Sequence, residues 1–398
     1  MNRCARCPLF VLLMMIAAVA TAQDERAQYP GLLARSYFGV SIGYINYPFT
    51  NESMEAPYQA ASIHVPHTAV KITLLGYRFN DHLSGQITYM RPVNWVEYRN
   101  INGDQSNRSV YMNVGGLTLK GNVPLGRKFR LYGEGGLGIV TRNGFTKDSL
   151  PAVKDATYAT FLMGGGLDYR LNKSWELVAG MNYAPGSEKH RQPYTMFFSG
   201  GFRYNMNPLA DEKVAAVQKA GYHFPKHLLQ VAYTTNALGY GVNDFVSQGA
   251  IPIFWGGDAE VKSGIAVNYQ RNVFHTKKVF ALDIGTSAGY WISDEHEQSF
   301  WTLSVYPLFR FNVIRSRAAD FYFYYSVAGP TYISRVIIDE EDTGRHFTFR
   351  DFMGIGSFIG KKKQLNAEIN IGHFSNGNIF PKNGGVKVPL SFTLGLTF

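Results

Sequence analysis

Apolar and polar residues alternate with a period of two along most of the chain, as in β-strands that have one apolar and one polar face. The last segment shows this most clearly, because apolar residues share one parity from Val388 to Phe398. The alternation predicts two groups of strands. The first lies at about 36–47, 67–80, 82–97, 108–123, 129–144, 157–171, 175–184 and 194–206, and the second at about 228–239, 257–272, 278–293, 299–314, 320–335, 346–360, 364–376 and 386–398.

The length of these strands favours a membrane barrel over a soluble β-sandwich, which also alternates. Most of them run to about 11–16 residues, whereas strands of soluble proteins usually have about five or six. Their polar faces are rich in glycine and mixed in charge, as the lumen of a small barrel would be. The chain also ends on Phe398, which resembles the aromatic end of the last strand in bacterial outer-membrane proteins.

The two groups of strands are separated by a stretch that does not alternate. Residues 208–226 have helical propensity and are far longer than a periplasmic hairpin turn. We therefore expect an all-β protein with two tandem eight-stranded antiparallel transmembrane barrels, at 31–207 and 227–398, joined by a periplasmic linker. A single sixteen-stranded barrel is the alternative.

The first 22 residues have the features of a cleaved signal peptide. Arg3 and Arg6 precede a short apolar core, and an A-x-A site ends at Ala22. The only two cysteines, Cys4 and Cys7, lie in this segment, so we expect a mature chain without a disulfide or a thiol nucleophile.

Composition then narrows the location and the partners. Beyond the signal we find no apolar run of about 18 residues, so an exported chain this rich in aromatic residues and glycine would enter a membrane as a closed barrel. The formal net charge of +10 suits contact with anionic phosphates, and a solvated basic surface is the alternative. Export argues against nucleic acid as a partner, so we expect a bacterial outer-membrane protein whose anionic partner would be lipid.

A histidine and a serine stand at the outer end of the fifteenth predicted strand. The apolar parity of Leu365, Ile369 and Ile371 continues to His373 and Ser375, which would place both side chains on the lipid-facing side at the level of the outer leaflet. A histidine beside a serine can accept its proton and activate it as a nucleophile. Only a membrane lipid would reach such a site easily. An interfacial girdle that merely tolerates polar residues is the alternative.

This stretch resembles a known family of enzymes. His373 to Asn376 reads H-x-S-N, and the loop after it contains P-x-N and glycines, as in the PagL family of outer-membrane lipid A 3-O-deacylases. Leu282–Trp291 is similar to the third strand of that family, and Phe349–Gly356 to the F-x-D-x-x-G-x-G of its sixth. The resemblance covers about 227–398. The first barrel resembles only the general OmpA-like barrel class, by its pattern.

The resemblance implies a reaction and roles for residues. The family removes the ester-linked 3-hydroxyacyl chain at the 3 position of lipid A, with a Ser-His-Glu triad and without a metal or cofactor. Ser375 would be the nucleophile and His373 the general base. Asn376, together with the turn from Asn383 to Gly385, would shape the site or its oxyanion hole.

The sequence departs from the family at one position of the triad. Counted from His373 without gaps, the glutamate of the family falls at Lys387, which cannot accept the imidazole N–H. The site could act as a His–Ser dyad, use another carboxylate, or be inactive. If the hairpin closes with Gly360 opposite Gln364, Asp351 lies opposite His373 and is the candidate for a substitute acid. The alternative is that Asp351 is an interfacial residue that only supports the fold.

Two functions from different classes follow. The first is an outer-membrane esterase that acts on lipid A in lipopolysaccharide, with Ser375 as nucleophile. The second is a non-catalytic barrel pair with a lipid-binding, adhesive or structural role, which Lys387 favours. The sequence leaves the role of the first barrel and the oligomeric state open.

Overall fold

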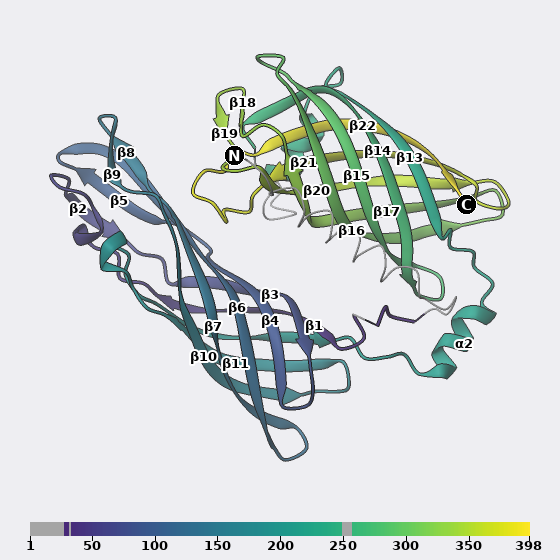
Figure 1. The fold of residues 1–398 in the computed structure, drawn as a ribbon, viewed down its shortest axis with the longest axis horizontal. Coiled ribbons are helices and arrows are strands. Elements are labelled where there is room, and N and C mark those ends of the chain that lie inside the picture. Colours follow the sequence, from purple (N-terminus) through teal and green to yellow (C-terminus); the bar gives the residue numbers. More distant parts are fainter. Residues whose placement is uncertain (1–27, 32, 249–256) are drawn as a thin grey trace, which may run out of the picture.

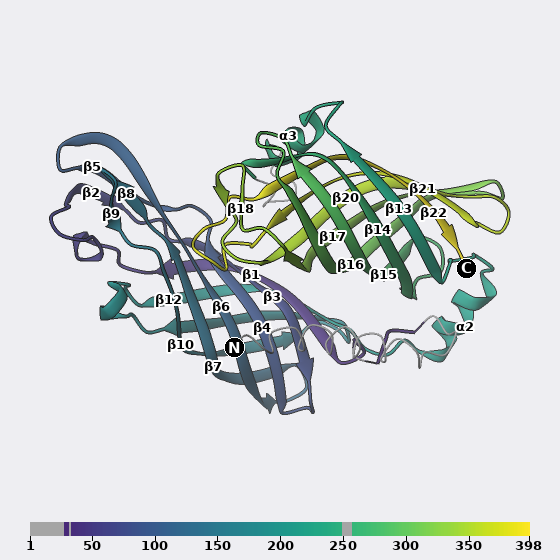
Figure 2. The same cartoon turned by 45° about the horizontal axis from the view of Figure 1, so that its top comes forward.

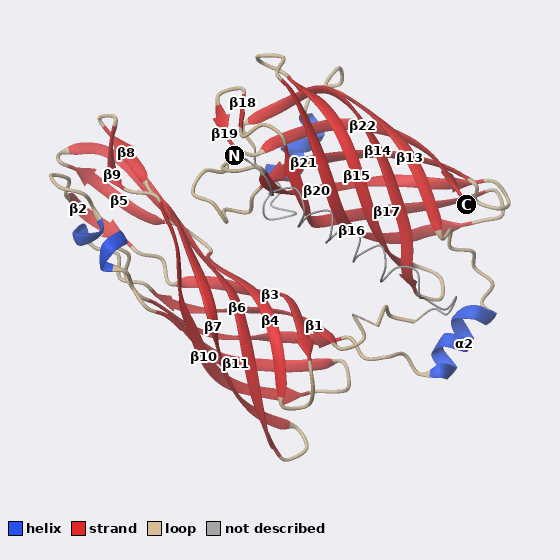
Figure 3. Ribbon diagram, viewed as in Figure 1, coloured by secondary structure: helices blue, strands red, loops and turns tan. Residues whose placement is uncertain are grey.

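The protein consists of two β-barrels joined by a short helical segment (Figure 1). The computed structural model describes residues 28–31, 33–248 and 257–398, so the expected signal peptide lies outside the described residues. Helix α2 (Asp211–Lys219) lies within the predicted linker, and both views show the barrels side by side (Figures 1 and 2). Strands make up most of both barrels (Figure 3). The predicted fold class is confirmed, and the single sixteen-stranded barrel is excluded.

The first barrel is a ring of eight antiparallel strands with a small sheet at one end. β1 pairs with both β3 and β12, and the pairing of β6 with β7 closes the ring. Its strands are β1 (Ser36–Asn46), β3 (Thr68–Arg78), β4 (Leu83–Pro92), β6 (Asp104–Leu125), β7 (Phe129–Asn143), β10 (Ala156–Arg170), β11 (Trp175–Ala184) and β12 (Thr195–Asn205). Shorter elements extend the loops: β2 (Ala60–His64), β5 (Val96–Ile101), β8 (Phe145–Lys147), β9 (Leu150–Val153) and the 3-10 turns η1 (Asn51–Ser53) and η2 (Glu188–His190).

The second barrel is also closed by its first and last strands. Its strands are β13 (His227–Thr235), β14 (Ala259–His275), β15 (Phe280–Ser293), β16 (Ser299–Arg315), β17 (Ala319–Ile333), β20 (Phe347–Ile359), β21 (Leu365–Ser375) and β22 (Val386–Thr397). The longer connections carry α3 (Gly241–Gln248) and the two-residue strands β18 (Ile337–Ile338) and β19 (Glu341–Asp342). All sixteen predicted barrel strands are present, with ends that differ by a few residues.

The walls of both barrels are apolar outside and polar inside. Large apolar side chains such as Leu119 of β6 and Leu394 of β22 are 56% and 71% exposed. Their sequence neighbours Lys120 and Thr393 are buried inside. This distribution is the reverse of that in a soluble protein. It is expected of a barrel whose outer wall contacts lipid. No helix among the described residues is long and apolar enough to cross a membrane.

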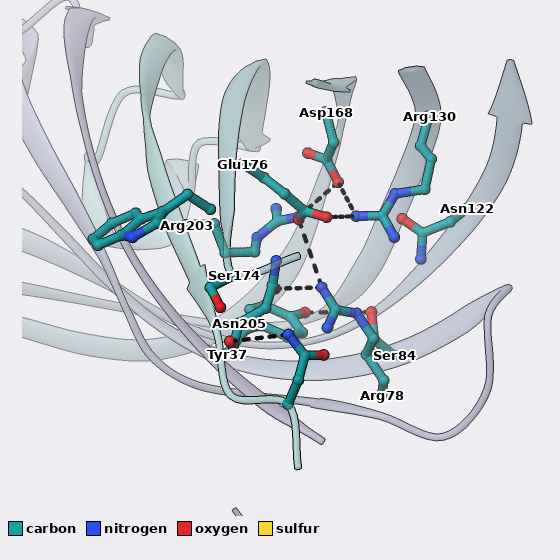
Figure 4. A network of polar contacts seen from close by, with 12 residues as sticks. Tyr37, Arg78, Ser84, Asn122, Arg130, Asp168, Ser174, Glu176, Arg203 and Asn205 are labelled. Atoms are coloured by element: carbon teal, nitrogen blue, oxygen red, sulfur yellow. Dashed lines mark hydrogen bonds and ion pairs between the residues drawn. The ribbon is translucent and has the colours of Figure 1, made fainter. Parts of the chain in front are cut away.

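Charged side chains bond across the lumen of the first barrel (Figure 4). The Asp168 carboxylate accepts from Arg203 at 2.6 Å and from Lys120 at 3.0 Å, while Arg203 also contacts Glu176 at 3.2 Å. Arg130 of β7 also pairs with Glu176 of β11. Such groups are stable in a narrow lumen only because each meets opposite charge. This network places charged side chains of five strands in the lumen of the first barrel.

Candidate active site

The register of the β20–β21 hairpin brings the predicted acid to the predicted base. Ile359 pairs with Leu365, and the ladder then runs without a shift to Asp351 opposite His373. This is the register expected from a turn at Gly360. Asp351 Oδ2 lies 3.8 Å from His373 Nδ1, within ion-pair range if the imidazole is protonated.

Asp351 is held in place by an irregularity in the neighbouring strand. The ladder between β17 and β20 shifts between Ser326 and Gly329, and Ala328 in this bulge has φ +53°. A positive φ at a non-glycine residue is uncommon and turns the backbone amide away from the ladder. The Ala328 N–H donates to Asp351 Oδ1, which leaves Oδ2 directed to His373.

His373 and Ser375 lie on the outer face of β21. The residue between them, Phe374, packs into the interior of the barrel against Trp291, with ring centroids 5.9 Å apart. Because successive side chains of a strand point to opposite faces, both functional side chains point outward. His373 is nevertheless only 2% exposed, in a region where α3 packs against β21 and β22. The outer face is therefore covered by protein at this point.

A bulge in β22 changes the predicted faces of the last strand. Asn370 pairs with Ser391 but Gly372 pairs with Val388, so Pro389 and Leu390 together stand opposite a single residue of β21. The sequence pattern placed Val388 on the lipid-facing parity, and this is wrong: Val388 is 4% exposed and belongs to the interior cluster. Proline cannot donate to a ladder, so it favours a bulge.

The same bulge turns Lys387 outward beside His373. These two residues pair directly across β21 and β22, so the position of the expected glutamate is the one occupied by the lysine. The Lys387 ammonium lies 3.1 Å from Glu260 Oε1 and 3.3 Å from Asp244 Oδ1. Neither carboxylate was predicted from the sequence, because Glu260 and Asp244 reach the site through a strand and a helix far away in the chain.

Helix α3 is fastened to the bulge by one side chain. Asn243 Nδ2 donates to the carbonyl oxygens of Gly372 at 3.3 Å and of Val388 at 3.0 Å. A bulge interrupts the ladder and leaves backbone groups to be satisfied elsewhere. Asn243 therefore stabilises the irregular backbone that sets the direction of Lys387.

The loop between β21 and β22 surrounds the Ser375 hydroxyl. Asn383 Nδ2 donates to Ser375 Oγ at 3.0 Å, and the Gly377 N–H donates to it at 3.2 Å. Ser375 Oγ lies 3.2 Å from Asn383 Oδ1, which also accepts the Asn376 N–H at 2.8 Å. Within the described residues, His373 is not among the hydrogen-bond partners of Ser375. The Ser375 hydroxyl is therefore bonded to Asn383 and Gly377 and not to the predicted base in this conformation.

The other predicted loop residues act at a distance from the hydroxyl. The buried Asn376 side chain donates to the carbonyl oxygens of Thr343 at 2.9 Å and Lys382 at 2.5 Å, which ties the loop to the β17–β20 connection. Gly385 accepts the Ala259 N–H at 3.2 Å and so ties it to β14. Of the predicted supporting residues, Asn383 alone contacts Ser375 by its side chain. Gly377, with φ +64°, was not predicted as a donor.

Two family models match the chain, one on each half. Residues 263–393 match the family described as lipid A 3-O-deacylase (PagL). This match covers most of the second barrel and agrees with the resemblance that the sequence predicts for it. Residues 9–205 match the outer membrane protein beta-barrel domain, so the predicted division into two barrel types is confirmed. The chain is a protein of the bacterial outer membrane.

Solved structures give only a general likeness to a single barrel. The outer membrane enzyme PagL is 13% identical with a TM-score of 0.30, and the match covers 43% of this chain and 99% of that one. Neisserial surface protein A is 15% identical with a TM-score of 0.29 over 43% and 96%. The N-terminal barrel of Pseudomonas aeruginosa OprF is 19% identical with a TM-score of 0.27 over 43% and 97%. No curated protein matches the chain.

Chemically, the site combines a hydroxyl, an imidazole and a carboxylate at the outer end of one hairpin. Among the described residues, no group of three or more His, Cys, Asp or Glu side chains is arranged to hold a metal ion. The described groups can support nucleophilic acyl transfer, in which an imidazole moves a proton and a carboxylate stabilises its charged form.

Proposed function

We propose that the second barrel is an esterase that removes the ester-linked 3-hydroxyacyl chain at the 3 position of lipid A, with Ser375 as nucleophile. One observation carries the proposal: His373, two residues from Ser375 on the outer face, has the Asp351 carboxylate 3.8 Å from its ring. The match of this barrel to the family described as lipid A 3-O-deacylase (PagL) supports the choice of substrate.

The reaction would proceed through an acyl-enzyme. The Ser375 hydroxyl turns from Asn383 to His373, which accepts its proton while the oxygen attacks the ester carbonyl. His373 then returns the proton to the departing sugar oxygen, which leaves lipid A with a free 3-hydroxyl group. A water molecule attacks the acyl-serine with His373 again as base and releases a 3-hydroxy fatty acid.

The remaining groups have supporting roles in this proposal. Asp351 would fix the orientation of His373 and stabilise the imidazolium, which is the task of the acid in a triad. The Gly377 N–H and Asn383 Nδ2, both directed at Ser375 Oγ, are the donors available to a developing oxyanion next to it. Lys387, paired with Glu260 and Asp244, would leave the acid role to Asp351.

The second candidate is a barrel that binds lipid without hydrolysing it. Two observations favour it: Lys387 occupies the position across from His373, and the Ser375 hydroxyl is bonded to Asn383 rather than to the base. Hydrogen bonds of a catalytic site are often loose before the substrate binds, so the second observation does not decide between the candidates.

Purified protein in mixed detergent–lipopolysaccharide micelles separates the two candidates. The assay measures release of free 3-hydroxy fatty acid by the wild-type protein and by Ser375→Ala, His373→Ala and the matched control Ser299→Ala. Ser299 is an exposed serine at the end of β16. The proposal predicts release only from the wild type and the control. No release from the wild type would favour the lipid-binding barrel, and equal release from all four would contradict the roles of Ser375 and His373.

A further inference from the structure

Polar side chains interrupt the apolar outer wall of the first barrel near its looped end. On β6 and β7, the outward positions Leu117, Leu119 and Leu137 are 58%, 56% and 45% exposed. Further along the same faces stand Asn113 and Thr141, which are only 4% and 2% exposed. An outward side chain of a barrel is buried only where other protein covers it.

Asn113 and Thr141 are covered by residues 376–385, the loop of the second barrel that follows Ser375. We call this segment the active-site loop. Tyr89 of β4 donates its hydroxyl to the Gly377 carbonyl at 2.9 Å, and Thr141 of β7 donates to the Ile379 carbonyl at 2.8 Å. Between them Asn113 donates its side-chain amide to the Asn378 carbonyl. Three consecutive carbonyls of the loop are thus bonded by three side chains of one wall.

A small hollow lined by aromatic residues and one ion pair lie beside these carbonyl bonds. Phe380 of the loop lines a small hollow together with Trp95 and Tyr111 of the first barrel, whose own rings lie 4.6 Å apart. The Lys382 ammonium lies 3.4 Å from the Asp155 carboxylate at the exposed rim. The exposed ion pair adds little to affinity, so the three carbonyl bonds carry the interaction.

The same loop residues reach Ser375 from their other side. The Gly377 N–H donates to Ser375 Oγ, while its carbonyl accepts from Tyr89. Asn378 Oδ1 accepts from Asn383 Nδ2 at 3.0 Å, and Asn383 contacts Ser375. The backbone segment held by the first barrel is therefore the segment that positions the donors around the nucleophile. Figure 2 shows this loop extending from the second barrel toward the first.

We propose that the outer wall of the first barrel is a docking surface for the active-site loop, and that Tyr89, Asn113 and Thr141 position the loop around Ser375. The two barrels would then act as one unit, with the first holding the site of the second in shape. The docking stands on the contacts alone, whereas its effect on catalysis rests on the proposed function.

Docking can be measured without any activity. Asp155→Cys with Lys382→Cys replaces the exposed ion pair in a chain whose only other cysteines, Cys4 and Cys7, lie in the expected signal peptide. A bifunctional thiol reagent that spans a lysine–aspartate pair should join the two barrels within one chain in outer-membrane vesicles. The matched pair of Lys382→Cys with Asn172→Cys, at the opposite end of the first barrel, should not react.

Loss of the carbonyl bonds should then weaken docking. Tyr89→Phe with Thr141→Val removes two donors and keeps the shapes, which should slow cross-linking about 10- to 30-fold if each bond contributes about 1 kcal/mol. The control is Thr157→Val, because Thr157 pairs with Thr141 on the neighbouring strand and is exposed. Its cross-linking should equal that of the wild type.

Kinetics tests the positioning role. Tyr89→Phe with Thr141→Val should lower kcat several-fold and leave KM for lipopolysaccharide unchanged, and Thr157→Val should change neither. Absent or intermolecular cross-links, or cross-linking insensitive to the double substitution, would overturn the docking surface. Normal docking with an unchanged kcat would overturn the positioning role. If the protein releases no fatty acid at all, the proposed function fails, while cross-linking still decides the docking.

Discussion

Asp351→Asn is the substitution that most sharply separates a working triad from a chance neighbour. An asparagine keeps the shape of the side chain, and its Oδ1 can still accept the Ala328 N–H, so the bulge of β17 should be preserved. Only the charge next to His373 is removed. In the proposed reaction this charge matters when the imidazole is protonated, which is in the transition state rather than in the resting enzyme.

The separation of 3.8 Å between Asp351 Oδ2 and His373 Nδ1 sets the expected magnitude. Coulomb attraction between unit charges at this distance is about 1 kcal/mol in water and about 4 kcal/mol at an effective dielectric constant near 20. Since about 1.4 kcal/mol corresponds to a tenfold change in rate, kcat should fall between about 6-fold and about 1,000-fold. KM should change little, because the uncharged imidazole of the resting enzyme gains less from the carboxylate.

The assay is release of 3-hydroxy fatty acid from lipopolysaccharide micelles over a range of substrate concentrations. Glu297→Gln is the matched control, since Glu297 is an exposed carboxylate at the same end of the second barrel and pairs with Lys262. The control should keep the kcat of the wild type. A kcat of Asp351→Asn within twofold of the wild type would refute the role of Asp351 as the substitute acid.

Three further predictions concern charge and stability. The charge-reversed double change Lys387→Glu with Glu260→Lys, added to Asp351→Asn, keeps this ion pair in reversed order and places a carboxylate opposite His373. It should raise kcat at least about threefold above that of Asp351→Asn in the same assay, which is part of the loss expected from the Coulomb attraction. Asn243→Ala leaves two buried carbonyls without their donor and should lower the free energy of unfolding by about 1–3 kcal/mol, measured by urea titration in detergent. Lys120→Met removes one partner of the buried Asp168, which keeps Arg203. It should therefore lower the free energy of unfolding by less than the about 3–5 kcal/mol expected when a buried charge loses its whole partner, and it should not change kcat.

Each of these has an outcome that contradicts it. A charge-reversed variant no more active than Asp351→Asn alone would show that a carboxylate across from His373 does not help the base. For Asn243, the control is Val242→Ala, an exposed position on the same helix, and equal unfolding midpoints would contradict the role of the amide. Loss of catalysis in Lys120→Met would show that the lumen of the first barrel reaches the site of the second.

The strands could be predicted because they follow a local rule. Successive side chains of a barrel strand face the lipid and the lumen in turn, so apolar and polar residues alternate along each strand. This alternation alone located all sixteen barrel strands. The register between Asp351 and His373 could also be predicted, because a short turn at Gly360 determines it. These features depend on neighbours within one hairpin.

The features that sequence reasoning missed depend on single residues or on distant segments. The bulge at Pro389 inverts the face of Val388 and turns Lys387 outward, and a proline inside a predicted strand was its only local signal. The carboxylates of Glu260 and Asp244 reach Lys387 through tertiary packing. The alternation of apolar and polar residues does not indicate contacts between distant segments. The contacts of the active-site loop with the first barrel could not be predicted for the same reason.

Mass spectrometry of lipid A shows whether Ser375 removes an acyl chain from this lipid in the outer membrane. Lipid A would be extracted from cells that carry the wild-type protein or Ser375→Ala at equal levels in the outer membrane. The account predicts loss of one 3-hydroxyacyl chain only with the intact serine. Lipid A of unchanged mass in both cultures, or the same loss with Ser375→Ala, would contradict it.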